Sequence, residues 1–136
     1  MSARKLTLPV IEKGSTYSHS LYWKNCSYSE AVIAGYTNTE QNWLDSTSNA
    51  TNLTGCTAKL QVRLTLNSDI LLELSTENLG IVITPTFGRI VLFASPTVTS
   101  TLNGSGGIYD LEIYFTGGKI VRLIEGKLSF TDEVTR

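Results

Sequence analysis

The most regular pattern of apolar and polar residues in this chain runs from Cys56 to Leu66. Every second side chain is apolar and the residues between them are polar or charged; the apolar set is Cys56, Ala58, Leu60, Val62, Leu64 and Leu66. A period of two places these side chains on one face of a β-strand, whereas a helix would spread them around its circumference. The pattern therefore predicts a strand with one buried and one wet face. Burial of its four large aliphatic side chains would contribute roughly 1.5–3 kcal/mol each.

Further segments with strand character are separated by turns rich in glycine, proline and asparagine. Alternation is clear over residues 15–23, which end at a candidate core anchor, Trp23, and over residues 108–115. A Thr-Gly-Gly turn joins the latter to a long strand over residues 119–130, in which Gly126 marks a bulge or a close contact. The remaining segments are residues 5–11, 70–74, 81–83 and 89–94. A total of seven to eight short strands predicts an all-β sandwich or barrel.

Three local features refine this prediction. Pro9 cannot donate a backbone hydrogen bond, so the first strand should lie at a sheet edge or contain a bulge. Residues 89–94 are apolar without alternation, which indicates a strand covered on both faces. Ser95 followed by Pro96 favours a short helical turn with the serine as its cap.

The least regular part of the chain is the stretch 26–51, which we predict to be one long irregular insertion. Ser29 and Glu30 favour a helical turn over residues 29–34, as a cap and a first-turn acid. Long loops in compact domains are uncommon and often functional. Tyr28, Tyr36 and Trp43 are therefore candidate interface residues; the alternative is that they pack back on the sheets and hold the loop down.

Composition narrows the class of protein. With 136 residues, of which 41% are hydrophobic, the chain fits a single domain, residues 1–136, with a sizeable core. A net charge of −1 supplies no basic excess for nucleic acid, and no apolar run approaches the roughly 18 residues of a membrane span. The first residues lack the apolar core of a signal peptide, so we expect folding in a cytoplasm. There, Cys56 should act as a small buried hydrophobe rather than form a disulfide with Cys26.

Residues that could support catalysis or metal binding are sparse. One histidine, His19, and two distant cysteines do not make a ligand set for a metal. His19 has no nucleophile or carboxylate at a recognisable spacing, so we interpret it as a partly buried, hydrogen-bonded strand residue. Asp110 and Glu112 share one strand face, as a hydrolase pair could, but the facing strand offers them ion partners in Lys119, Arg122 and Lys127. We expect no enzyme activity, no metal and no cofactor.

Three longer motifs stand out when they are taken in order. They are Lys-Gly-Ser-Thr-Tyr-Ser-His-Ser-Leu-Tyr-Trp-Lys-Asn at residues 13–25, Asn-Leu-Thr-Gly-Cys-Thr-Ala-Lys-Leu-Gln-Val-Arg at residues 52–63, and a hairpin over residues 106–136 with Tyr-Asp-Leu-Glu and Glu-Gly-Lys-Leu. This order resembles a family of small structural proteins of tailed bacteriophages, usually encoded among tail genes. It is also similar in layout to the immunoglobulin-like N-terminal module of phage baseplate upper proteins. The resemblance does not extend over residues 26–51.

The resemblance implies an immunoglobulin-like antiparallel β-sandwich in a non-enzymatic virion component, an adaptor or attachment protein of the tail, baseplate or fibres. Such a protein would be made in the host cytoplasm, would contact other virion structural proteins and would form a homo-oligomer in a symmetric assembly. A capsid decoration protein is a close alternative. A glycan-binding module, in which Tyr28, Tyr36 and Trp43 stack on sugar rings, is an alternative from another class.

Overall fold

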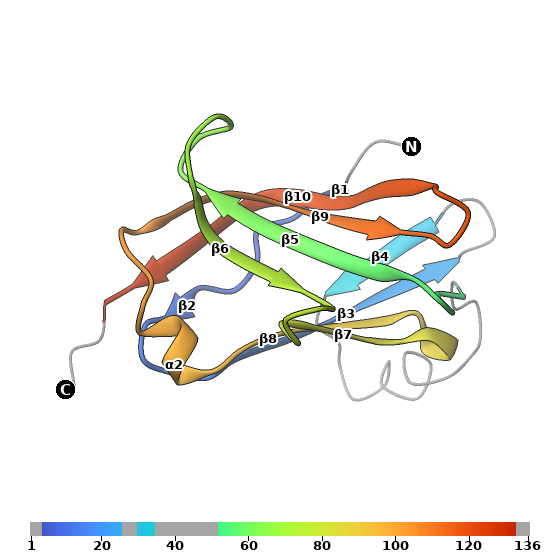
Figure 1. Ribbon diagram of the computed structural model, residues 1–136, viewed down its shortest axis with the longest axis horizontal. Coiled ribbons are helices and arrows are strands. Elements are labelled where there is room, and N and C mark those ends of the chain that lie inside the picture. The colour runs from blue at the N-terminus through green and yellow to red at the C-terminus, as the bar shows by residue number, and fades with distance from the viewer. Residues whose placement is uncertain (1–3, 26–29, 35–51, 133–136) are drawn as a thin grey trace.

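The computed structural model describes residues 4–25, 30–34 and 52–132, which form two β-sheets packed face to face (Figure 1). The strands in this part of the chain are β1 (Arg4–Lys5), β2 (Ile11–Glu12), β3 (Tyr17–Asn25), β4 (Glu30–Ala34), β5 (Thr57–Arg63), β6 (Ile70–Ser75), β7 (Ile81–Thr84), β8 (Arg89–Ala94), β9 (Gly106–Tyr114) and β10 (Ile120–Thr131). Two short helical turns, η1 (Pro85–Phe87) and α2 (Pro96–Thr99), lie between strands, and Ser95 caps the second as predicted. The all-β prediction is confirmed.

The two sheets differ in size and composition. The large sheet has the strand order β1-β10-β9-β5-β6, with β2 also paired to β10, and the small sheet has the order β4-β3-β8-β7. Neighbouring strands are antiparallel, except that β1 and β2 run parallel to β10. The strand with the clearest sequence pattern, β5, lies between β9 and β6.

The apolar core lies between the two sheets. Ala58, Leu60 and Val62 of β5 point inward and are 2% exposed or less. Trp23 at the end of β3 is also 2% exposed, and Phe115 meets its ring edge-on at a centroid distance of 6.2 Å. Since Trp23 belongs to the small sheet and Phe115 follows β9 of the large sheet, this aromatic pair joins the two layers. The prediction that Trp23 anchors the core is confirmed.

The N-terminal segment, residues 4–12, lies along one edge of β10. Pro9 falls between its two short strands, as expected for a proline at a sheet edge. Leu8 and Ile11 enter the core at 2% and 0% exposure, and each burial contributes roughly 1.5–3 kcal/mol. Gly126 permits the close contact predicted for it, because a Cβ atom at this position would lie 2.1 Å from the carbonyl oxygen of Leu6.

Two predictions about strand ends and exposure are wrong. The alternating pattern was expected to bury Leu64 and Leu66, but β5 ends at Arg63 and these leucines are 63% and 78% exposed in the following turn. The strand 89–94 was expected to be covered on both faces, yet Phe93 is 40% exposed on the outer side of β8. In both cases the sequence remains apolar at positions that no second layer of the fold covers.

The prediction of a helical turn over residues 29–34 is also wrong. Glu30–Ala34 is the strand β4, which pairs antiparallel with β3 in the register Leu21↔Ala34 to Asn25↔Glu30. The edge of β3 offers backbone hydrogen-bond partners, and the β-branched pair Val32-Ile33 suits a strand better than a helix. This part of the predicted insertion is therefore regular, and residues 26–29 and 35–51 lie outside the described residues.

We predict that Gly126→Ala lowers the free energy of unfolding by about 1–3 kcal/mol, because the added methyl group must displace the Leu6 carbonyl. Gly117→Ala is the matched control, since no atom lies within 4 Å of a Cβ atom there and its φ is not positive. Urea denaturation followed by circular dichroism measures both variants. Equal losses in the two would show that the close contact at Gly126 is not a constraint.

Candidate functional site

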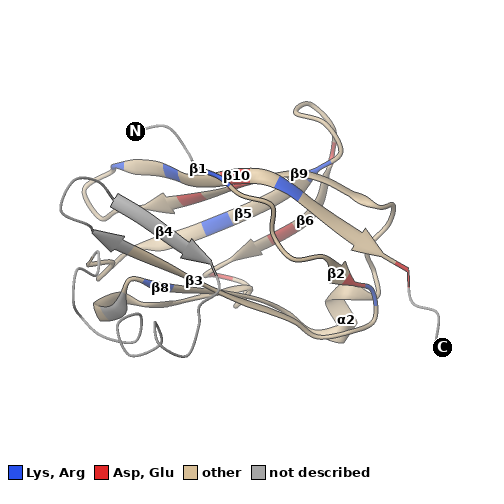
Figure 2. Cartoon of the chain, turned by 180° about the vertical axis from the view of Figure 1, so that it is seen from behind, with Lys and Arg blue, Asp and Glu red and all other residues tan. Residues whose placement is uncertain are grey.

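The outward face of the large sheet carries charged side chains on several strands, whereas Arg89 is the one charged residue of β7 and β8 (Figure 2). Alternation causes this arrangement: in β5 the inward Leu60 and Val62 are separated by Gln61 and flanked by Lys59 and Arg63, which face out. The face is therefore a direct product of the pattern that builds the core.

Cross-strand register brings residues of β5, β9 and β10 into rows on this face. Asp110 of β9 lies between Gln61 and Glu125, and Glu112 lies between Lys59 and Arg122. Residues directly opposite in neighbouring antiparallel strands are close enough for their side chains to interact. One row thus places an acid between two cations, and the adjacent row places an acid beside another acid.

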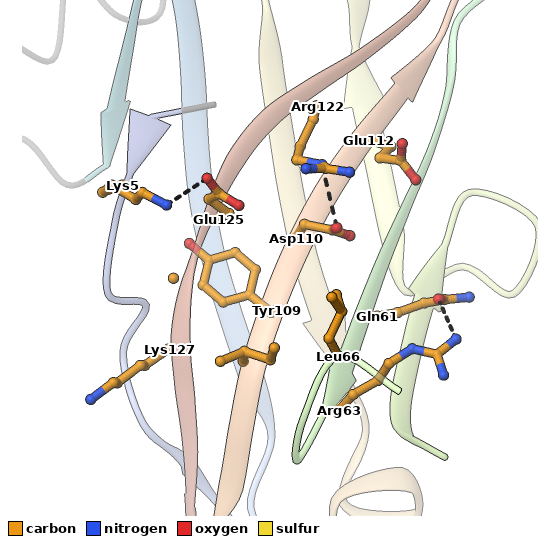
Figure 3. A pocket seen from close by; sticks show the side chains of 12 residues that line it. Lys5, Gln61, Arg63, Leu66, Tyr109, Asp110, Glu112, Arg122, Glu125 and Lys127 are labelled. Carbon is orange, nitrogen blue, oxygen red and sulfur yellow. Dashed lines mark hydrogen bonds and ion pairs between the residues drawn. The ribbon is translucent and has the colours of Figure 1, made fainter. Parts of the chain in front are cut away.

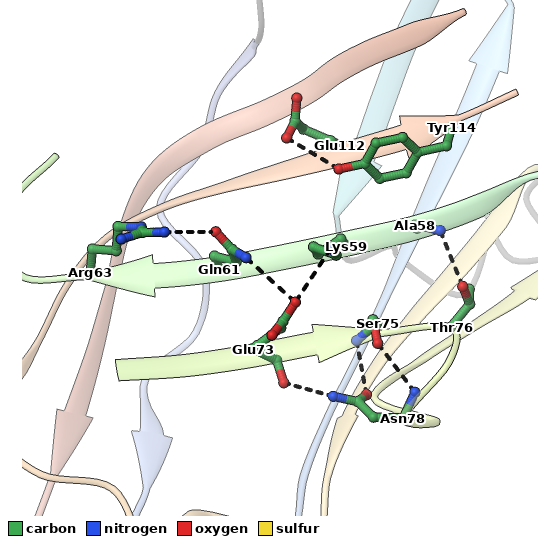
Figure 4. Close-up of polar contacts among 10 residues, drawn as sticks. All are labelled: Ala58, Lys59, Gln61, Arg63, Glu73, Ser75, Thr76, Asn78, Glu112 and Tyr114. Carbon is green, nitrogen blue, oxygen red and sulfur yellow. Dashed lines mark hydrogen bonds and ion pairs between the residues drawn. The ribbon is translucent and has the colours of Figure 1, made fainter. Parts of the chain in front are cut away.

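A chain of polar contacts links β5 to β6 (Figure 4). The Nζ atom of Lys59 lies 3.6 Å from Oε1 of Glu73, and Gln61 donates to the same oxygen at 3.4 Å. Arg63 in turn donates from Nη2 to the side-chain oxygen of Gln61 at 3.3 Å. On the other side of β5, the Tyr114 hydroxyl donates to Glu112 at 3.4 Å. These contacts fix the orientation of several outward side chains.

A hollow of about 410 Å³ lies on this face over β5, β9 and β10 (Figure 3). Nε of Arg122 lies 3.5 Å from Oδ2 of Asp110, and Lys5 donates to Glu125 at 2.6 Å. Four cationic and three acidic side chains line the hollow; with its other residues they are Lys5, Gln61, Arg63, Leu66, Ile108, Tyr109, Asp110, Glu112, Arg122, Glu125, Gly126 and Lys127. Because the hollow carries both positive and negative side chains, it is better suited to contact a polar protein surface than to bind a polyphosphate chain.

The pKa values of Asp110 and Glu125 are shifted in opposite directions. Burial raises the pKa of Asp110, and the negative charge of Glu112 raises it further, while the Arg122 guanidinium opposes both. The hydrogen bond from Lys5 lowers the pKa of Glu125. The expected sharing of one face by Asp110 and Glu112 is confirmed, and so is the pairing of Asp110 with Arg122. Lys119 lies instead over the Phe115 ring, 5.3 Å from its centroid.

The loop between β5 and β6 protrudes at one end of the large sheet (Figure 1), and exposed aliphatic side chains lie at this end. Four aliphatic side chains gather there and are 40–78% exposed; we call them the apolar tip, and they are Leu64, Leu66, Ile70 and Ile108. Ile70 and Ile108 flank Arg63 on either side in the sheet register. Leu66 and Ile108 also line the hollow, so the tip and the charged face are continuous.

The loop that carries Leu64 and Leu66 of the apolar tip is braced by its own hydrogen bonds. Ser68 accepts from the Thr65 amide through Oγ at 2.9 Å, and the same hydroxyl donates to the Thr65 carbonyl at 2.9 Å. The Arg63 guanidinium donates to the Ser68 carbonyl at 2.6 Å. A braced loop loses little conformational entropy when a partner covers it. Exposed apolar side chains held in this way are typical of a protein contact surface.

The other residues singled out from the sequence are the three aromatic interface candidates, the histidine and the cysteines. Tyr28, Tyr36 and Trp43 lie outside the described residues, so their interface role stays a prediction. His19 is partly buried as predicted and burial lowers its pKa, but within the described residues its Nε2 atom has no hydrogen-bond partner. Cys56 is a free, partly buried thiol that packs against the core.

The apolar tip was missed because the alternation of β5 continues through Leu64 and Leu66. The signal that could have located it is the polar run Asn67-Ser68-Asp69, which favours a turn soon after Arg63. Among the described residues, no three or more His, Cys, Asp or Glu side chains are grouped to hold a metal ion.

In residues 4–25, 30–34 and 52–132, no helix has the length and apolar character needed to cross a membrane. Comparison of the chain with family models and with curated protein sequences finds no match.

We predict that Asp110→Asn maintains or raises the free energy of unfolding at pH 7, by less than about 1 kcal/mol because the site is partly exposed. A raised carboxyl pKa means that the folded state binds more protons than the unfolded state just above the ordinary value of 3.8. The contribution of Asp110 to stability therefore falls as pH rises through this range. Urea denaturation between pH 3 and 7 measures the difference, which should disappear at the acidic end.

Glu125→Gln is the matched control with the opposite sign. Because Lys5 lowers the pKa of Glu125 below 4.5, this acid stabilises the fold above that value and loses its contribution as pH falls. Glu125→Gln should therefore be less stable than the parent protein at pH 7 and approach it in acid. Asp110→Asn behaving like Glu125→Gln would contradict the assigned environment of Asp110.

Proposed function

We propose that this protein is a non-enzymatic structural component of a tailed-phage virion, an adaptor or attachment protein of the tail, baseplate or fibres. The sequence motifs that resemble phage structural proteins fall on β3, on the turn into β5 and on the β9–β10 hairpin. Trp23 lies near the end of the first motif and is buried, and Gly55 of the Leu-Thr-Gly turn has a φ of 78°. The first two motifs thus supply a core residue and a turn to the two-sheet fold.

The strand order supports an immunoglobulin-like assignment within this proposal. With β3 as strand B, the strands β5 to β10 take the places of C, C′, D, E, F and G, so that G-F-C-C′ form one sheet and B-E-D the other. The strand β4 occupies the position beside B that strand A holds in constant-type domains. This variation lies in the same stretch where the sequence resemblance stops.

The observation that carries the proposal is the apolar tip at the end of a mixed-charge sheet face. Leu66 is 78% exposed, yet its loop is held by the Ser68 and Arg63 hydrogen bonds rather than left to rearrange. A rigid apolar projection beside paired charges suits a contact with another structural protein, in which the apolar part supplies affinity and the charges supply orientation.

In a virion, a contact surface as small as the apolar tip would be sufficient for attachment. Structural proteins of particles are assembled as symmetric rings or arrays, in which each copy repeats the same contact. Weak contacts repeated around a ring add to a firm attachment. The partners in this proposal are other virion structural proteins and further copies of the chain.

We predict that mass spectrometry of purified particles, from a phage that encodes this chain, finds the protein in many copies. In complementation with tagged protein, Leu66→Asp should reduce incorporation by about tenfold or more, because a charge would be buried at the contact. Ile120→Asp is the matched control: Ile120 is 57% exposed but lies at the opposite end of the large sheet. Soluble, folded Leu66→Asp protein that enters particles normally would exclude the tip as the contact.

Labelling the tagged protein with gold and imaging the particles would separate a tail, baseplate or fibre location from a capsid-surface location. A capsid decoration protein would show label over the head, whereas an adaptor would show it on the tail. Absence of the protein from purified particles would overturn the proposal in both forms.

A further inference from the structure

The N-terminal segment, residues 4–12, makes its sheet contacts in the described part of the chain with β10 alone. Its two strands pair at Ile124–Glu125 and Phe130–Thr131 of β10. Between them, the Leu6 and Leu8 amides donate to the carbonyls of residues 125 and 127 at 2.9 and 3.2 Å. The segment is thus an edge strand whose release breaks no other strand pair, but exposes Leu8 and Ile11 and breaks the hydrogen bond that the Tyr17 hydroxyl donates to the Pro9 carbonyl.

The edge of β10 is shaped and charged for this segment. The absent side chain at Gly126 leaves room for the Leu6 carbonyl, which also accepts a hydrogen bond from the Tyr109 hydroxyl at 2.6 Å. Ion pairs mark both ends of the contact: Lys5 with Glu125 at 2.6 Å, and Lys13 with Asp132 at 2.8 Å. In both pairs the cation comes from the N-terminal side and the acid from β10 or the residue after it.

A short turn, residues 13–16, connects the segment to β3. Gly14 adopts a φ of 83°, and the Ser15 amide donates to the Glu12 carbonyl at 3.1 Å. Thr99 of α2 holds the turn from outside, because its hydroxyl accepts from the Gly14 amide at 3.0 Å and donates to the Ser15 carbonyl at 2.8 Å. This turn must open before the segment can leave β10 of its own chain.

We infer that the edge of β10 is an interaction surface for the N-terminal segment of a second copy of this chain, and that copies exchange their segments. The contacts of residues 4–12 with β10, including the Lys5–Glu125 ion pair and the fit of the Leu6 carbonyl against Gly126, are the same in an exchanged pair. The two arrangements therefore differ in the turn 13–16 and in the local concentration of neighbouring copies. This inference does not depend on the proposed virion function.

The test uses single cysteines at Lys5 and Glu125, which are register partners, in a background in which Cys26 and Cys56 are replaced by serine. Lys5→Cys protein carrying a tag is mixed with untagged Glu125→Cys protein, incubated at high concentration and oxidised mildly. A disulfide between these two chains can form in register only when the segment of one chain occupies β10 of the other. The expected result is a tagged–untagged disulfide dimer that increases with incubation time and protein concentration.

The matched control mixes Lys5→Cys with Lys119→Cys, whose cysteine lies beyond the start of β10 and away from the register partner. A Lys5–Glu125 dimer no more abundant than the Lys5–Lys119 dimer would overturn the inference. A second pair, Glu12→Cys with Thr131→Cys, whose residues are exposed register partners, repeats the measurement at the other end of the segment. Circular dichroism verifies that each variant is folded before mixing.

The turn supplies an independent readout. Thr99→Val keeps the shape of the side chain but removes both of its hydrogen bonds to the turn. The rate of dimer formation between the Lys5→Cys and Glu125→Cys proteins should rise about tenfold in this variant. An unchanged rate would show that the turn 13–16 does not control release of the segment.

Discussion

The carbonyl group of Leu6 makes the contact on which the closed edge of the large sheet depends. It accepts a hydrogen bond from Tyr109 of β9 and lies against Gly126 of β10, so one main-chain group connects the N-terminal segment to the β9–β10 hairpin. Burial raises the pKa of Tyr109 well above its usual range, which keeps this hydroxyl a donor. Leu8 and Ile11 follow in the same segment and are buried in the core. By fixing the backbone at Leu6, this carbonyl helps to hold the segment in the position from which both side chains enter the core.

The fold could be predicted from the sequence where the information is local. Period-two alternation locates β5, β9 and β10, and the Ser95-Pro96 pair locates α2, because each depends on neighbouring residues. Pairing partners are not local, so no pattern in residues 5–11 indicates that this strand runs parallel to β10. The strand β4 was missed for a different reason: the sequence Ser29-Glu30 matches the start of a helix, and this local signal was weighted above the β-branched pair Val32-Ile33, although the partner strand β3 immediately precedes β4 in the strand order.

The candidate site was predicted in part. The hairpin pattern placed Asp110, Glu112 and Arg122 on one face, since that face follows from alternation. The apolar tip could not be found in the same way, because Leu64 and Leu66 continue the period of β5 after the chain has already turned. The hydrogen bonds between Ser68 and Thr65 hold the turn that follows β5. The alternation of apolar and polar residues gives no information about such a side-chain contact.

The parallel pairing of the N-terminal segment with β10 has a mechanical consequence. Arg4 lies beside Ile124 near one end of this contact, and Asp132 follows Thr131, which pairs with Glu12 at its other end. A pull that separates Arg4 from Asp132 would therefore slide the two strands along each other and load their hydrogen bonds together, in shear, rather than open them one after another. The geometry favours resistance to tension along the axis of β10, and exchanged segments would transmit such tension from one copy to the next.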